Sequence, residues 1–100
     1  MNEYVISPQE LSELLQTPDD VQLVDVRTIE KHNNFNIGGQ HIPLEDLQER
    51  SGELNPNKLV VTYCTMGGRS MVALKYLLSV GFTNVKSLEG GVTKWQEDNL

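Results

Sequence analysis

Leu-Val-Val-Thr-Tyr-Cys-Thr-Met-Gly-Gly-Arg-Ser, residues 59–70, joins a strand pattern directly to a helix pattern. Its first five residues form a continuous, mostly β-branched run, which is typical of a strand covered on both faces. From Ser70 to Val80 the apolar residues recur at helical spacing, and Gly81 stands where a left-handed cap would end the helix. The stretch therefore predicts a buried strand, a short loop and a buried helix in succession.

The same alternation of strands and helices extends toward both ends of the chain. Val21–Val26 is a second apolar run, and shorter strands are expected at Tyr4–Ile6 and Asn84–Leu88. Ser7-Pro8-Gln9-Glu10 combines a capping box with a proline at the first helical position, and residues 92–95 indicate a last helix. This order predicts a parallel sheet with helices on both faces, in which ligands bind beyond the carboxyl ends of the strands.

Length and composition limit what the chain can be. It has 100 residues, 38% of them hydrophobic, which fits one domain spanning residues 1–100. A net charge of −6, with eight basic residues spread along the chain, argues against a nucleic-acid partner. No apolar stretch approaches the ~20 residues of a membrane helix, and no signal-peptide pattern is present, so we expect no membrane association. The one cysteine cannot form an internal disulfide, and a free thiol fits a cytoplasmic location.

Cys64 ends the predicted strand where the loop passes into a helix. Gly67 and Gly68 permit backbone angles that are closed to other residues, so that successive N–H groups can point inward and bind an anion. The helix that starts near Ser70 and the guanidinium of Arg69 add positive potential. A lone cysteine at a strand end is more often a small buried hydrophobe. This combination instead predicts a lowered pKa and a nucleophilic thiolate.

Taken together, the motifs resemble those of the rhodanese family. The loop from Cys64 to Arg69 matches the family's active-site pattern of Cys, two variable residues, Gly, one variable residue and Arg. Four further pieces fall where the family has them, namely Leu23–Arg27, Asn36–Gly39, His41–Leu44, and Leu88–Gly91 followed by Trp95. The resemblance extends from Ser7 to Trp95, and the sequence is also similar to rhodanese domains attached to enzymes that adenylate sulfur-carrier proteins.

The resemblance implies a three-layer α/β/α fold with a five-stranded parallel sheet. It also implies a sulfurtransferase in which Cys64 takes a sulfane sulfur as a persulfide and passes it to a thiophilic acceptor, without a metal or another cofactor. The donor would be thiosulfate or a persulfide, and the acceptor a thiol or a sulfur carrier. The residues expected to form the persulfide-binding loop are Thr65, Met66, Gly67, Gly68, Arg69 and Ser70.

Asp25 and Arg27 are expected to support this site. They stand at the end of the predicted strand 21–26 and should lie at the same edge of the sheet as Cys64. In a functional role, Asp25 would orient neighbouring groups and Arg27 would add positive potential near the thiolate. We favour a structural role over this functional one, in which Asp25 and Arg27 form an ordinary ion pair that holds the end of the strand.

Four other residues carry weaker signals. Gly90 and Gly91 are expected to let the last helix approach the Cys64 loop closely. His32 and His41 lack metal-ligand spacing, so surface or structural roles are favoured over catalysis.

Two departures from the family's pattern stand out, of which the first bears on local packing more than on the reaction and the second bears on the substrate. Lys31 and His32 occupy places where the family tends to have an acidic and an aromatic residue. Thr65 and Met66 are uncharged, whereas good thiosulfate users often carry extra basic residues in the loop. Because thiosulfate is a dianion, a persulfide is a reasonable natural donor.

Two other functions stay open on the sequence alone. A cysteine phosphatase also places Cys before Arg, but its loop resembles Cys, five residues, Arg, whereas four residues separate Cys64 from Arg69. The smaller ring fits a sulfur atom better than a phosphoryl group. A non-catalytic binding or regulatory module would not need a nucleophile, and this chain keeps both Cys64 and Arg69.

Overall fold

The strands form one parallel sheet in the order β1-β5-β4-β2-β3 in the computed structural model, which describes residues 3–100. Their bounds are β1 (Val5–Ile6), β2 (Gln22–Asp25), β3 (Gln40–His41), β4 (Val60–Tyr63) and β5 (Val85–Leu88). β4 lies at the centre of the sheet, between β2 and β5. The five-stranded parallel sheet expected from the sequence is therefore confirmed.

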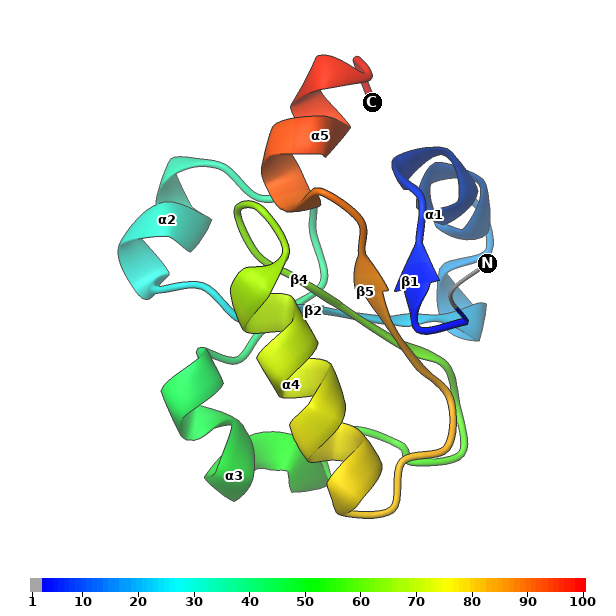
Figure 1. Ribbon diagram of the computed structural model, residues 1–100, viewed down its shortest axis with the longest axis vertical. Helices are drawn as coiled ribbons and strands as arrows, with labels where there is room; N and C mark the ends of the chain where they lie inside the picture. The colour runs from blue at the N-terminus through cyan, green and yellow to red at the C-terminus, as the bar shows by residue number, and fades with distance from the viewer. Residues whose placement is uncertain (1–2) are drawn as a thin grey trace.

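Five α-helices surround this sheet (Figure 1). Their bounds are α1 (Pro8–Leu14), α2 (Ile29–Asn34), α3 (Leu47–Arg50), α4 (Gly68–Ser79) and α5 (Gly91–Glu97), with short 3-10 turns at 18–20, 44–46 and 51–53. No helix within residues 3–100 is both long and apolar enough to cross a membrane.

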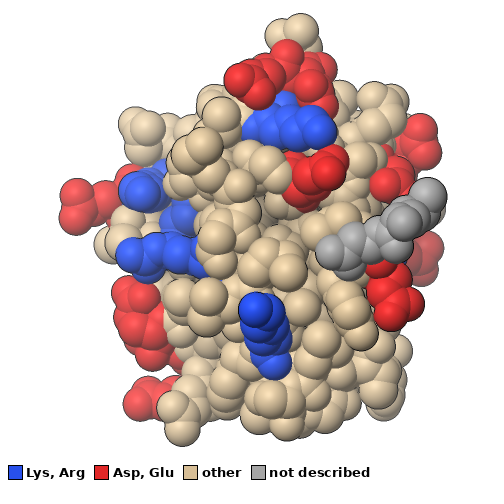
Figure 2. Space-filling view, in the orientation of Figure 1, with Lys and Arg blue, Asp and Glu red and all other residues tan. Residues whose placement is uncertain are grey.

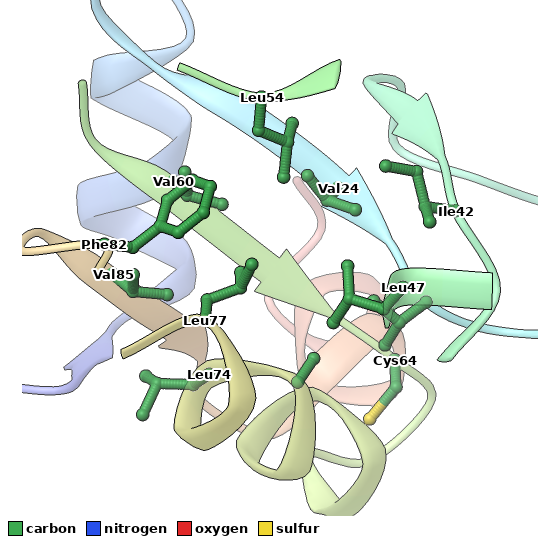
Figure 3. Packing of buried hydrophobic residues seen from close by; sticks show 12 residues of the cluster. Val24, Ile42, Leu47, Leu54, Val60, Cys64, Leu74, Leu77, Phe82 and Val85 are labelled. Carbon is green, nitrogen blue, oxygen red and sulfur yellow. The ribbon is translucent and has the colours of Figure 1, made fainter. Parts of the chain in front are cut away.

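The two faces of the sheet bury separate apolar clusters, which makes the fold three-layered. On one face the strands pack against α3 and α4, through Val24, Val60, Leu47, Leu74, Leu77 and their neighbours (Figure 3). On the other face they pack against α1 and α5, through Leu23, Val61, Leu11, Val92, Trp95 and their neighbours. Each fully buried Leu or Val contributes about 1.5–3 kcal/mol. Cys64 belongs to the first cluster, so its side chain faces α4.

The predicted helix ends follow local chemistry that the sequence shows directly. Ser7 and Glu10 form the predicted capping box at the start of α1. Gly81 has a φ of 106°, as expected of a left-handed residue after α4. The helix α4 begins at Gly68 rather than near Ser70. The elements α2, β3 and α3 were not predicted from the sequence.

Candidate active site

Cys64 directly follows β4, and the chain turns from it into the first turn of α4 beside α5 (Figure 1). Gly67 has a φ of 115°, a left-handed conformation that favours glycine, and it is the residue that turns the loop into the helix. Gly68 is already helical, and a Cβ at this position would meet no other atom within 4 Å. The prediction that both glycines use angles closed to other residues is therefore wrong for Gly68, because the helix starts one residue after Gly67.

The Cys64 sulfur is surrounded by neutral hydrogen-bond donors. The N–H of Gly67 donates to Sγ at 3.0 Å and the N–H of Ser70 at 3.4 Å. The Ser70 hydroxyl oxygen lies 3.5 Å from the same sulfur. The residue is only 3% exposed, so water contributes little to solvating the sulfur. The loop backbone thus directs N–H groups at the sulfur, in the concave arrangement that the sequence predicted.

These contacts set the acidity of the thiol. Burial raises the pKa of Cys64, but the hydroxyl of Ser70 and the N–H groups of Ser70, Gly67 and Met66 lower it and prevail. The pKa therefore lies below the ordinary value of a cysteine, as the sequence predicted. The physical cause is hydrogen bonding to the thiolate rather than the charge of Arg69, which is not among these contributions.

Three residues form the outer part of the loop. Arg69 is exposed, and its guanidinium lies 3.9 Å from the Glu45 carboxylate rather than against the sulfur. Met66 is 74% exposed, and Thr65 is half-buried. Arg69 thus stands at the rim, as expected, although part of its charge is balanced by Glu45.

Ser70 connects the loop to two neighbouring strands through hydroxyl groups. Its hydroxyl donates to the Gly67 carbonyl at 3.1 Å and lies 2.6 Å from the hydroxyl of Ser87 on β5. The hydroxyl of Thr62 on β4 donates to the Ser70 carbonyl at 2.9 Å. Ser87 and Thr62 are buried, and sequence reasoning missed both. Their signal is a small polar residue inside an otherwise apolar strand.

The helix α5 braces the loop from the other side. The N–H groups of Val92 and Thr93 donate to the carbonyls of Cys64 and Thr65, at 2.9 and 3.0 Å. Gly91 has a φ of 59°, and a Cβ on it would collide with the Cys64 carbonyl oxygen and lie 2.5 Å from that of Thr65. The predicted close approach of the last helix is therefore confirmed at Gly91.

This combination of sheet and loop has counterparts among known proteins. Residues 7–98 match the model of the rhodanese-like domain. The chain belongs to the rhodanese-like family. A sulfurtransferase from Allochromatium vinosum is 33% identical over 95% of this chain and 90% of that protein. The thiosulfate sulfurtransferase GlpE from Shewanella oneidensis is 36% identical over 79% of each chain.

The chain is also similar to parts of longer proteins. A tRNA uridine(34) hydroxylase from Nitrobacter winogradskyi is 33% identical over 92% of this chain, which spans 38% of its length. Among solved structures, a rhodanese-related protein from Thermoplasma volcanium superimposes with a TM-score of 0.83 at 26% identity, over 94% of this chain and 91% of that one.

In this rhodanese-like domain, Asp25 and Arg27 form the ion pair that the sequence predicted. Arg27 Nε and Nη2 lie 2.9 and 2.7 Å from the two carboxylate oxygens of Asp25, and Nη2 also donates to the Phe35 carbonyl at 2.6 Å. Both residues are buried. Within residues 3–100, no hydrogen bond joins either of them to Cys64, so the pair holds the strand end beside the loop instead of contacting the sulfur.

The two histidines contact this end of β2 from α2 and β3. His32 Nδ1 lies 2.9 Å from a carboxylate oxygen of Asp25, and His41 Nε2 lies 2.7 Å from the Arg27 carbonyl oxygen. Their rings stack with centroids 4.4 Å apart. Burial raises the pKa of Asp25, but Arg27 and His32 lower it and prevail. The histidines thus have the structural role that the sequence favoured.

Proposed function

We propose that the protein is a sulfurtransferase that carries a sulfane sulfur as a persulfide on Cys64. The observation that carries this proposal is the ring of N–H donors and the Ser70 hydroxyl directed at a buried thiolate. Hydrogen bonds from Ser70 and the loop N–H groups lower the pKa of Cys64, which favours the nucleophilic thiolate. The names of two relatives, a sulfurtransferase and a thiosulfate sulfurtransferase, support the same activity.

The first half of the reaction loads the enzyme. The Cys64 thiolate attacks the sulfane sulfur of a persulfide, R–S–S⁻, forming Cys64–S–S⁻ and releasing R–S⁻; with thiosulfate the leaving group is sulfite. In the second half, an acceptor thiolate attacks the terminal sulfur and the Cys64 thiolate leaves. Electrons and charge balance within each step, so sulfur transfer requires no external oxidant or reductant.

The loop supports both halves with the same contacts. The N–H groups of Gly67 and Ser70 stabilise the Cys64 thiolate, which is the nucleophile first and the leaving group later. Thr65, Met66, Gly68 and Arg69 complete the opening through which substrates arrive. The Asp25–Arg27 pair supports the site indirectly, because it fixes the strand adjacent to β4.

The donor is proposed to be a thiol-bound persulfide rather than thiosulfate. Arg69 is the cation of the loop, and it lies 3.9 Å from Glu45. A dianion gains little from a single cation that is exposed and partly balanced. A persulfide carries one negative charge and fits the neutral donors around Sγ. The acceptor is proposed to be a thiol or a sulfur carrier.

The test is to incubate the protein with a small-molecule persulfide, and separately with thiosulfate and cyanide. We expect the persulfide to add the mass of one sulfur atom to Cys64, and thiosulfate with cyanide to form thiocyanate more slowly. Cys64→Ser should lose both, and Ser79→Ala, which removes an exposed hydroxyl on α4, should retain both. Transfer by Cys64→Ser at the parent rate would refute the proposal, and hydrolysis of an aryl phosphate without sulfur transfer would favour a phosphatase.

A further inference from the structure

We propose that the groove between α3 and α4 is a docking site for an amphipathic helix of a partner protein, one that carries apolar and basic side chains. The groove has a volume of about 310 Å³, and its lining residues are Leu44, Glu45, Leu47, Gln48, Val72 and Tyr76. Most of these side chains are aliphatic or aromatic. The groove lies outside the Cys64 loop, so its occupation does not depend on the proposed function.

The α4 side of the groove presents apolar surface to solvent. Arg69, Val72 and Tyr76 are spaced three and four residues apart, so they form one stripe along α4. Val72 is 54% exposed. Within residues 3–100, no hydrogen bond engages the hydroxyl of Tyr76 or the side-chain amide of Gln48 across the groove. Exposed apolar surface rimmed by such polar groups is typical of a protein-binding site.

The α3 side of the groove is acidic. Glu45, Asp46 and Glu49 are exposed carboxylates on α3 and on the turn before it. Within residues 3–100, the one ion pair among them joins Glu45 to Arg69 over 3.9 Å, and both side chains are more than half exposed. Figure 2 shows acidic side chains on the side of the molecule where α3 lies in Figure 1. The charge therefore favours a basic partner over an acidic one.

Size and charge together select the occupant. Pockets for drug-sized ligands span roughly 300–1,000 Å³, so the groove suits one or two side chains of a larger partner better than a whole cofactor. A second copy of this chain would bring the same acidic wall and a net charge of −6, and the two would repel. An amphipathic helix that places leucine in the groove and lysine beside Glu45 and Glu49 meets both conditions.

The groove adjoins the active site without including the Cys64 sulfur. The buried Leu47 belongs to the same apolar cluster as Cys64 (Figure 3). Glu45 lies beside Arg69, which is part of the Cys64 loop. A basic side chain that binds Glu45 competes with Arg69 for the carboxylate, so a helix in the groove lies next to the rim of the loop.

The binding test uses two synthetic helical peptides with leucine at every third or fourth position and either lysine or glutamine at the flanking positions. In NMR titrations of the parent protein, the lysine peptide should shift the amide signals of Gln48 and Val72 saturably. The glutamine peptide should bind about threefold to tenfold more weakly, because it lacks the ion pairs. Equal binding of the two peptides, or shifts spread over the whole surface, overturns the inference. Shifts of the same signals on dilution of the protein alone also overturn it, because a second copy would then occupy the groove.

A matched pair of apolar variants locates the contact. Val72→Ser should weaken binding of the lysine peptide by about threefold to tenfold. Ile29→Ser is the control, because Ile29 is an apolar residue of α2 with the same exposed fraction of 54%. Equal effects of the two substitutions overturn the inference. Cys64→Ser should bind the peptide as the parent does, so a failure of sulfur transfer leaves the docking site standing.

A second pair of variants tests the acidic wall. Glu45→Gln combined with Glu49→Gln should weaken binding of the lysine peptide by about threefold to tenfold and leave the glutamine peptide unaffected. The control is Asp19→Asn combined with Asp20→Asn, which removes the same charge from exposed residues elsewhere. If the control weakens binding equally, the peptide responds only to net charge and the inference is wrong.

Discussion

Asp25 and Cys64 end neighbouring strands at the same edge of the sheet, and both are buried groups that favour the anion. For each of them burial raises the pKa and hydrogen bonds more than offset it. Their partners differ in kind. Asp25 is held by the charged Arg27 and by His32, whereas Cys64 is held by backbone N–H groups and the hydroxyl of Ser70.

The kind of partner distinguishes Asp25, an anion that holds the structure together, from Cys64, the anion that we propose to react. A carboxylate in a two-point ion pair is fixed in place, because leaving the pair would expose both buried charges. A thiolate held by neutral dipoles is stabilised without a counter-ion that would bind it permanently. The sulfur transfer that we propose requires this property, because Cys64 would form and break a bond to sulfur while its surroundings stay unchanged.

The largest expected effect is at the structural anion. Arg27→Met leaves the buried carboxylate of Asp25 with only His32 as a side-chain partner, and it should lower the free energy of unfolding by about 3–5 kcal/mol. Urea denaturation monitored by circular dichroism measures this loss. Arg50→Met is the control, because its ion pair with Glu53 is 36–44% exposed and should contribute less than about 1 kcal/mol. Equal losses of stability in Arg27→Met and Arg50→Met would show that the buried Asp25–Arg27 pair contributes no more than an exposed ion pair.

The second effect concerns the brace behind the thiolate. Gly91→Ala places a Cβ against the carbonyls of Cys64 and Thr65 at a φ of 59°. We expect a loss of at least about 2 kcal/mol in stability and about a 10-fold to 100-fold fall in sulfur transfer, because the loop must shift. Gly52→Ala is the control, since a Cβ there meets nothing within 4 Å. A Gly91→Ala protein with the parent transfer rate would show that α5 does not position the loop.

The third effect concerns the reactive anion itself. Ser70→Ala removes the hydroxyl that contributes most to lowering the pKa of Cys64. A hydrogen bond to a charged group is worth about 1.5–3 kcal/mol, so its loss should raise the pKa of Cys64. The pH dependence of Cys64 alkylation by iodoacetamide measures this shift, and Ser79→Ala is the control. An unchanged profile in Ser70→Ala would assign the lowered pKa to the backbone alone.

The same variant has a consequence for stability. Because the pKa of Cys64 is lower in the folded chain than in the unfolded chain, the thiolate adds stability that is complete above about pH 8.5. This contribution is lost as the pH falls through the folded pKa. Ser70→Ala should therefore lose more stability relative to the parent at pH 9.5 than at pH 6.

The smallest effect is expected at Ser87, which lies beside the hydroxyl of Ser70 rather than beside the Cys64 sulfur. The hydroxyl of Ser70 has one proton, so when it donates to the thiolate instead of the Gly67 carbonyl, its oxygen can accept from Ser87. Ser87→Ala should raise the pKa of Cys64 by less than Ser70→Ala does. Thr62→Val is the control, since its hydroxyl binds the carbonyl of Ser70 rather than the hydroxyl. It should cost about 1 kcal/mol of stability without changing the pKa.

The sequence predicted the strand that carries Cys64 and the helix that follows it, because their signals are local. A buried strand appears as a continuous apolar run, and the cap of α1 requires only residues three positions apart. The loop was predictable for the same reason, since the sulfur and its donors lie within the stretch 64–70.

The rest depends on contacts between distant parts of the chain. β3 has two residues and α2 buries none of its own, so neither has an apolar pattern to detect. The hydroxyl of Ser87 reaches Ser70 only because β5 lies next to β4, a pairing that strand patterns do not specify. The anchoring of His41 on the Arg27 carbonyl likewise requires the order of the strands.

The brace from α5 also orders events during protein synthesis. The loop carbonyls of Cys64 and Thr65 receive their donors from Val92 and Thr93, which the ribosome adds later. The strand β1, made first, must likewise wait for β5 before it can pair. A growing chain that has passed Cys64 therefore carries the thiol in a loop that still lacks the hydrogen bonds from Val92 and Thr93.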